Sequence, residues 1–198
     1  MKASDKEQIM RDFKNHELEK YLVDIKKYIL DNFYDKEKAC FVRNKTDRKM
    51  DISLLGLVYP FNMFSPKEKK IENTVERINM TLRTYTGGYL RYEGDSYNGG
   101  NPWIIANLWL AEYYIAAGIK NRARECFDFA IIGSNEHGLL PEQVDNNTMD
   151  PAWVIGLGWS HAMFINVLEK LIDNFGLLGT VGLGFVGKGI FSYFKGGT

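Results

Sequence analysis

Six segments of the 198-residue sequence carry apolar residues at helical spacing, and the connections between these segments alternate in length. The short connections fall near residues 60–65 and 118–120, whereas the long ones cover roughly residues 33–50, 83–100 and 134–159. Successive helices in such an array run antiparallel, so every second connection lies at the same end. The sequence therefore predicts an all-α fold of antiparallel helices with its three long loops on one rim. Because loops carry most binding and catalytic residues, we expect a functional site there.

Start and stop signals place the first three helices. Apolar residues at intervals of three to five predict a helix from about residue 6 to 32. Asp51 opens the apolar run ISLLGLVYP, where periodicity does not separate a helix from a buried strand and the neighbouring segments favour a helix. The clearest start is at Ser65, because the serine, the following proline and the glutamate at the third helical position form a capping pattern.

The last three helices have similar signals. Asn101-Pro102 repeats the pattern of cap and proline before WIIANLWLAEYYIAA, which Gly118 ends. A further helix follows almost at once and stops at Gly133, so the two form a helical hairpin. Ser160 is expected to cap the last helix.

Charge and cysteine content exclude several classes of partner. Lys plus Arg and Asp plus Glu each total 25, so the formal net charge is 0, and neither nucleic acid nor a membrane is an expected partner. Cys40 and Cys126 are far apart and outside any Cys/His cluster, so we predict buried free thiols and no metal site. No cofactor is expected, because no phosphate-binding or dinucleotide fingerprint accompanies the glycines.

The two ends of the chain differ in character. The start is rich in Lys, Glu and Asp and has no apolar signal segment, so a cytoplasmic location is expected. We expect one domain over residues 1–175, followed by a glycine-rich apolar tail over residues 176–198 that is loosely structured. The tail is either an authentic segment that lies over the domain or the unnatural end of a truncated or frame-shifted reading.

The second long loop, GGYLRYEGDSYNGGNPW, combines aromatic residues with an arginine and acidic residues among glycines. Tyr and Trp faces stack on sugar rings, while Arg and Asp offer paired donors and acceptors to hydroxyl groups. This mixture suits a carbohydrate better than a phosphate. The same composition is also good turn chemistry, and composition alone does not separate the two readings.

The third long loop, NEHGLLPEQVDNNTMDPAWVIGLGWSHA, holds Glu142 between an apolar approach and Gln143. Such a setting suits a partly desolvated carboxylate that is oriented by an amide, whereas a solvated surface charge is the simpler alternative. His137 and His161 flank the loop without a Ser or Cys nucleophile signature. Hydrogen-bonding or packing roles are therefore favoured over a hydrolytic triad or metal ligation.

Three motifs that follow one another in the sequence allow a more specific interpretation of the second and third long loops. RYEGDSYNGGNPWI, followed after the helical hairpin by GLLPEQVD and then GWSHA, resembles the catalytic domain of glycoside hydrolase family 15, the glucoamylases and their prokaryotic relatives. The resemblance covers roughly residues 15–172. It implies an (α/α)6 barrel, two concentric rings of helices, of which this chain would form the C-terminal half. It also implies inverting hydrolysis of terminal α-glucosidic bonds in starch, maltodextrin or related oligosaccharides.

The resemblance also implies roles for individual residues. Glu142, in LLPEQ, matches the general base that activates the attacking water. Arg91 and Asp95, in RYEGD, match residues that hydrogen-bond sugar hydroxyls or organise the arginine, and Tyr92 lies on the same segment. The aromatic matches are Trp103 in NPW and Trp159 in the Trp-Ser pair beside the base.

In that family the N-terminal half brings the general acid, and none of its motifs occurs in these 198 residues. We therefore expect Glu142 to fill only one of the two carboxyl roles and the chain alone to be incomplete as a catalyst. Two alternatives stay open: a non-catalytic glucan-binding or regulatory half-barrel, and an inactive gene fragment. Half of a closed helical ring would expose apolar edges, which predicts self-association.

Overall fold

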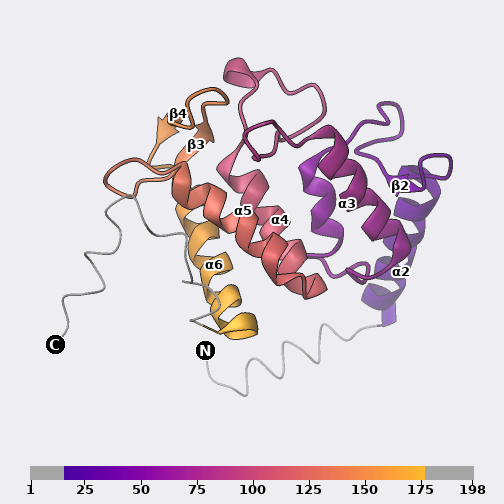
Figure 1. Cartoon of the computed structure of the whole chain (residues 1–198). Helices are drawn as coiled ribbons and strands as arrows, with labels where there is room; N and C mark the ends of the chain where they lie inside the picture. The colour runs from indigo at the N-terminus through magenta and orange to yellow at the C-terminus, as the bar shows by residue number, and fades with distance from the viewer. Residues whose placement is uncertain (1–15, 177–198) are drawn as a thin grey trace.

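The computed structural model describes residues 16–176, and this part of the chain is mainly helical (Figure 1). The prediction of an all-α fold is confirmed. The predicted residues 6–15 of the first helix and the tail from residue 177 onward lie outside the described residues. In chain order the helices are α2 (His16–Phe33), η1 (Ile52–Leu57), α3 (Lys69–Thr81), η2 (Tyr97–Gly99), α4 (Ile104–Ala117), α5 (Lys120–Ile132) and α6 (Gly158–Phe175), where η marks a 3₁₀ helix.

Helix α4 lies at the centre of the helical array. It is buried on almost every side and packs against α5, α6 and η1. A helix that is apolar all round has no face for solvent, so other elements must surround it. Gly118 ends α4 in the left-handed conformation (φ 77°), which glycine adopts without steric cost, and α5 follows directly. The predicted helical hairpin is therefore present.

Two predicted helix starts differ from the structure. The Glu68 carboxylate accepts a hydrogen bond from the Ser65 amide (2.9 Å), as in a capping box, yet Glu68 itself is still extended and α3 begins only after it. Helix α6 begins at Gly158, so Ser160 lies inside the first turn and the prediction of Ser160 as its cap is wrong. The Ser160 hydroxyl instead donates to the carbonyl of Pro141 (3.0 Å), which ties α6 to the third long loop.

Two short antiparallel hairpins, which the sequence did not predict, occupy the first and third long loops. Strand β1 (Tyr34–Asp35) pairs with β2 (Cys40–Phe41), and β3 (Pro141–Val144) pairs with β4 (Pro151–Ile155). Strands as short as these leave too few residues for an alternation of apolar and polar side chains to stand out.

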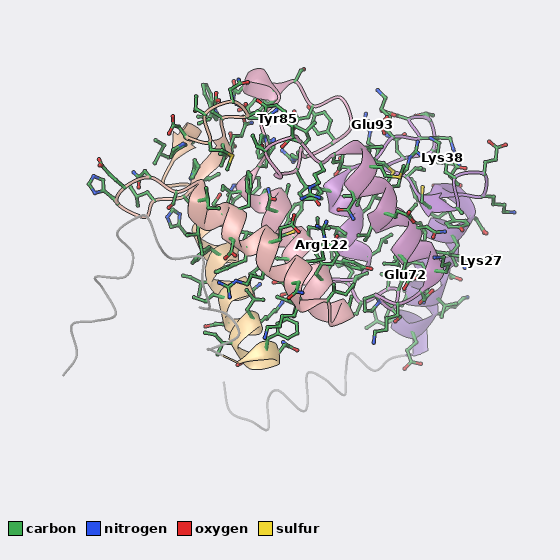
Figure 2. The ribbon with its side chains drawn as sticks, in the orientation of Figure 1. Lys27, Lys38, Glu72, Tyr85, Glu93 and Arg122 are labelled. Carbon is green, nitrogen blue, oxygen red and sulfur yellow. The ribbon has the colours of Figure 1, made fainter. Side chains whose placement is uncertain are left out.

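The long loops meet at one end of the helices, as predicted (Figure 1). The second loop joins the third where the Val144 amide donates to the carbonyl of Pro102 (3.0 Å). It joins the end of the first loop where the Glu93 amide donates to the Met50 carbonyl and the Met50 amide donates to the Glu93 carboxylate, both at 3.0 Å. Figure 2 shows Glu93 and Tyr85 at this end of the molecule, which we call the loop rim.

Tyr89 fastens the second loop to the helices below it. Its hydroxyl donates to the side-chain oxygen of Asn79 on α3 (2.6 Å) and accepts from the guanidinium of Arg122 on α5 (3.2 Å). Its backbone carbonyl accepts from the Trp103 amide at the start of α4 (2.9 Å). One buried tyrosine thus links three helices to the segment that leads to Arg91.

Apolar side chains are exposed along two edges of the array, which we call the α2 edge and the β4–α6 edge. Helices α2 and α6 lie on opposite sides of the molecule (Figure 1). In residues 16–176, none of the helices is both long and apolar enough for a membrane span. The exposed apolar residues of the α2 edge are Leu18, Tyr21, Leu22, Val23, Ile25 and Tyr28. Those of the β4–α6 edge are Trp153, Val154, Ile155, Trp159 and Ile165.

Candidate active site

The hairpin of β3 and β4 carries Glu142 to the loop rim in an irregular register. Pro141 pairs with Ile155 and Gln143 pairs with Ala152, so Glu142 alone opposes two residues of β4. This extra residue makes a β-bulge, which bends a strand and changes the direction of nearby side chains. Glu142 therefore belongs to a paired strand and not to an open loop.

The Glu142 carboxylate is partly withdrawn from water at this bulge. Glu142 is half-buried, and its Oε2 atom is buried with no hydrogen-bond partner among the residues that the structure describes. Burial raises the pKa of Glu142, while the positive charge of Arg91 opposes part of that increase. A partly desolvated carboxylate beside a cation is a candidate for acid–base catalysis.

Asp95 is buried within the second loop and holds the loop in shape. Its Oδ2 accepts from the indole N–H of Trp103 (2.9 Å), and its Oδ1 accepts from the amide of Tyr97 (3.0 Å). The Arg91 amide also donates to Oδ2 (3.4 Å). Gly100 lies beside this turn with φ 70°, and a Cβ atom there would stand 2.8 Å from the Asp95 carbonyl oxygen, so only glycine fits. The bond to Arg91 involves only its backbone amide, so the sugar-binding or arginine-organising role of Asp95 stays a prediction from the resemblance.

Arg91, Trp103 and Tyr97 form a stack next to Glu142. The guanidinium of Arg91 lies 5.2 Å from the centre of the Trp103 ring, and the Tyr97 ring stacks on Trp103 with centres 5.7 Å apart. Trp103 is buried and its backbone bridges to that of Gln143, the neighbour of Glu142. Arg91 is exposed. The stack thus orients Arg91 and leaves it open to a ligand.

Tyr92 and Trp159 make no ring contact with Trp103 or Tyr97 among the described residues. Tyr92 is half-buried, bridges through its backbone to Asp51, and has the guanidinium of Arg43 at 5.5 Å from its ring centre. Trp159 is exposed in the first turn of α6. Among the described residues, no ring contact joins Tyr92 or Trp159 to Trp103. Their sugar-binding roles stay predictions from the resemblance.

Three residues near Glu142 were not among the predicted site residues. Gln143 is fully buried, and its Nε2 donates to the Tyr97 carbonyl (3.5 Å). Trp153 is exposed and meets the Tyr97 ring edge to face, with centres 6.4 Å apart. The aromatic-rich second loop is a signal for Tyr97. Trp153 accompanies Glu142 on the third long loop of the sequence, but its contact with Tyr97 depends on the strand register and could not be predicted.

The remaining histidine and cysteine side chains have structural settings. His161 Nε2 accepts from the Leu140 amide (3.2 Å), so its Nδ1 is assigned the proton and donates to the Leu157 carbonyl (2.9 Å). This agrees with the predicted hydrogen-bonding role. Cys40 and Cys126 are buried free thiols, as predicted. Within residues 16–176, no group of three or more His, Cys, Asp or Glu side chains is placed to hold a metal ion.

Comparisons with known sequences point to one class of enzyme. No protein-family model matches the chain. An uncharacterized glycosyl hydrolase of Methanocaldococcus jannaschii is 34% identical over 148 residues, which cover 67% of this chain and 24% of that protein. Trehalase 1 of Sulfolobus acidocaldarius is 26% identical over 75% of this chain and 26% of its own length, and a trehalase of Thermoplasma volcanium is 29% identical over 75% and 24%. The chain thus spans about a quarter of the length of these curated relatives.

Solved structures share the fold. A wild-type glycosidase matches with a TM-score of 0.68 and 23% identity, over 75% of this chain and 42% of that chain. A glycosidase variant solved in complex with glucose matches with a TM-score of 0.68 and 22% identity, over the same shares. The helical arrangement therefore matches part of the fold of these solved chains. The sequence relatives of this chain are glycosyl hydrolases, trehalases among them, and the solved structures that share its fold are glycosidases.

Proposed function

We propose that this chain carries the base-bearing half of an inverting, glucoamylase-like α-glucosidase site, with Glu142 as the general base. The observation that carries the proposal is the buried Oε2 of Glu142, without a partner among the described residues and beside the charge of Arg91. A general base needs a lone pair that is available to water and a pKa shifted toward the working pH. Burial shifts the pKa of Glu142 in the required direction, and because the residue is only half-buried, water can reach the part of the side chain other than Oε2.

In the proposed reaction, Glu142 takes a proton from a water molecule while that water attacks the anomeric carbon of a terminal glucose. The water approaches from the face opposite the departing oxygen, so the configuration inverts. Arg91 holds sugar hydroxyls, because its guanidinium is oriented by Trp103 and is exposed. A second carboxyl, about 6.5–9.5 Å from the first, must protonate the departing oxygen.

The acidic side chains near Glu142 on the loop rim have other tasks. Glu93 and Asp95 accept hydrogen bonds that hold the loops together. Asp145 accepts from two backbone amides, and these bonds lower its pKa, whereas a general acid needs a raised pKa. We therefore assign the general acid to polypeptide outside residues 16–176, in the complementary half of the barrel.

The proposed substrates are α-glucosides with a terminal glucose. The motif resemblance to glucoamylases favours maltodextrins and related oligosaccharides. The trehalases among the sequence relatives, aligned over three quarters of this chain, favour trehalose. Both substrate types present an α-linked terminal glucose to the base, so both belong in the first assay.

A non-catalytic sugar-binding role is the second candidate. The stack of Arg91, Trp103 and Tyr97 is complete within this chain and does not depend on a general acid. It offers a sugar an aromatic surface and a planar set of donors. Binding of an α-glucoside without hydrolysis, even in the presence of the complementary half, would favour this role.

The deciding assay uses α-D-glucosyl fluoride with the full chain. Fluoride departs with little protonation, so the base suffices for this substrate, whereas maltose and trehalose should release no glucose above background. We expect the inverted β-anomer of glucose as the first product, detected by proton NMR. Glu142→Gln should lower turnover by a factor of order 10²–10⁴ with little change in sugar binding.

The matched control is Glu136→Gln, because Glu136 is a highly exposed glutamate on the same loop. This variant should keep the wild-type rate. Fluoride release no faster than in buffer, or an undiminished rate in Glu142→Gln, would contradict the assignment of Glu142 as the base.

A further inference from the structure

The second long loop begins with a small hairpin over residues 83–90, which we call the loop hairpin. Arg83 on its first arm bridges to Tyr89 on its second arm. Thr86 lies at the tip between the arms, and Arg91 follows the second arm directly. The loop hairpin therefore carries the tip threonine and ends at the arginine of the candidate site, on one short piece of chain.

The tip of the loop hairpin is bonded to the turn between β3 and β4. The Thr86 hydroxyl donates to the side-chain oxygen of Asn146 (2.9 Å). Beside it, the Tyr85 hydroxyl donates to the side-chain oxygen of Asn147 (2.7 Å). The Asn146 amide in turn donates to the side-chain oxygen of Asn101 (3.2 Å), near the other end of the second long loop. Side chains from both ends of that loop thus hold the turn.

Bonds within the turn connect it firmly to the strand of Glu142. Oδ1 of Asp145 accepts from the next two backbone amides after Asn146 (2.8 and 2.9 Å). The Asp145 amide donates to the Asp150 carbonyl (2.8 Å), which closes the turn at its base. Glu142 lies four residues before Asn146, which is about 13 Å along a strand. A displacement of the turn would therefore change the direction of β3 at the bulge of Glu142.

The distance between Glu142 and Arg91 matters because their charges interact. Burial raises the pKa of Glu142, and the positive charge of Arg91 opposes that increase. Asp95, Asp145 and His161 lie on the elements around Glu142, yet among the charged groups of residues 16–176 only Arg91 shifts its pKa. The interaction of two charges weakens as they separate, so a small movement of the β3–β4 hairpin would change the basicity of the carboxylate.

We infer that Thr86 and Asn146 are positioning residues, which hold Glu142 at its distance from Arg91 by joining the loop hairpin to the β3–β4 turn. This inference rests on the proposed function and adds two half-buried residues that the motif resemblance does not single out. Neither residue has to touch the sugar. Both act through the separation of the proposed base from the arginine.

The test measures the pKa of Glu142 in the full chain by carbon-13 NMR of its carboxyl group, whose signal is assigned by its loss in Glu142→Gln. Thr86→Val nearly keeps the shape of the side chain and removes the hydroxyl donor. The pKa of Glu142 should rise, because its carboxylate then lies farther from the charge of Arg91. The acidic limb of kcat/KM against pH for α-D-glucosyl fluoride should move to higher pH with it, and kcat/KM should fall about tenfold.

Three further variants separate positioning from a merely structural role. Thr86→Ser restores a hydroxyl and should recover most of the wild-type pKa and rate. Thr46→Val removes a bond of the same kind, from the Thr46 hydroxyl to the side-chain oxygen of Asn44 (3.1 Å) within the first long loop, and should change neither value. In an Arg91→Ala background, Thr86→Val should no longer shift the pKa of Glu142, because the interaction on which Thr86 acts is then absent.

The outcomes separate this inference from the function on which it rests. No rise in the pKa of Glu142 in Thr86→Val, or an equal rise with and without Arg91, overturns the positioning role while the proposed glycosidase site stands. A rise that depends on Arg91 in a chain that leaves α-D-glucosyl fluoride intact supports the positioning role and overturns the proposed function.

A variant at the exposed side of the same contact covers the case in which Thr86→Val does not fold. Tyr85→Phe removes only the hydroxyl that donates to Asn147, and Tyr85 is 74% exposed, so the chain should still fold. The pKa of Glu142 should rise in this variant as well, by less than in Thr86→Val. An unchanged pKa in the folded Tyr85→Phe chain then overturns the inference.

Discussion

The indole N–H of Trp103 donates a 2.9 Å hydrogen bond to Oδ2 of Asp95, and both side chains are buried. This bond joins the start of α4 to the loop that carries Arg91. Asp95→Ala should lower the free energy of unfolding by about 1–3 kcal/mol, because the indole N–H would stay buried without an acceptor. Urea denaturation measures this loss. Asp95→Asn, whose amide oxygen still accepts, should lose less; equal losses would show that this hydrogen bond is not the cause.

Arg91→Ala should change the pH dependence of hydrolysis as well as its rate. The charge of Arg91 lowers the pKa of Glu142 against the effect of burial, so its removal raises that pKa. Because the base must be deprotonated, the acidic limb of the profile of kcat/KM against pH for α-D-glucosyl fluoride should move to higher pH.

Arg91→Lys is the matched control for this change. Lysine keeps the positive charge but loses the planar fork of the guanidinium, so sugar binding should weaken while the acidic limb moves less than in Arg91→Ala. An unchanged limb in both variants would show that Arg91 does not act on Glu142.

Lys170 and Glu112 form an ion pair between α6 and α4, remote from the proposed site. Lys170 Nζ lies 2.7 Å from a carboxylate oxygen of Glu112 and 3.3 Å from the centre of the Tyr59 ring, and Glu112 is only 3% exposed. Burial raises the pKa of Glu112, and the bond with Lys170 opposes part of this increase. The stability linked to this raised pKa is fully present below the unfolded-state pKa of about 4.5 and is lost as the pH rises through the folded-state value.

Lys170→Met should therefore destabilise the chain more at neutral pH than in acid. The cost should be about 3–5 kcal/mol near neutrality, where a buried carboxylate is left without its cation, and smaller below pH 4.5, where that carboxyl is protonated. Urea denaturation at the two pH values measures the difference. The double variant Lys170→Met/Glu112→Gln should recover much of the loss, and an equal cost at both pH values would contradict the linkage.

The two apolar edges should make the chain associate with itself. We expect species larger than a monomer in size-exclusion chromatography with light scattering, and Leu22→Glu on the α2 edge should shift them toward the monomer. Met80→Glu, at an exposed residue of α3 outside both edges, is the control. A monomeric wild-type chain that binds no hydrophobic dye would contradict this prediction.

The sequence predicted the features that depend on local signals and on the order of elements. Gly118 and Gly133 end their helices as expected, because a helix C-terminus is specified by the residues beside it. The single loop rim follows from the alternation of connection lengths. The bond from Ser160 to Pro141 was not predictable, because it joins parts of the chain 19 residues apart and depends on how α6 packs.

Only part of the candidate site was predictable from the sequence, because motifs identify residues but do not show how the loops pack. The motif resemblance singled out Glu142, Arg91, Asp95 and Trp103, and the structure brings these four together at the loop rim. Motif matching assigns positions in the sequence but not the directions of side chains, and Trp159 is exposed in the first turn of α6 without a ring contact to Trp103 among the described residues.

The bulge in the β3–β4 hairpin allows Glu142 and Trp153, which lie opposite each other, to differ in burial. In a regular antiparallel pair, directly opposed side chains share one face of the ladder, so an inward carboxylate would draw its partner inward as well. The extra residue in β4 removes that coupling, and Glu142 is half-buried while Trp153 is exposed. A substitution at residue 153 should therefore change the exposed surface beside the hairpin without changing the burial of the Glu142 carboxylate.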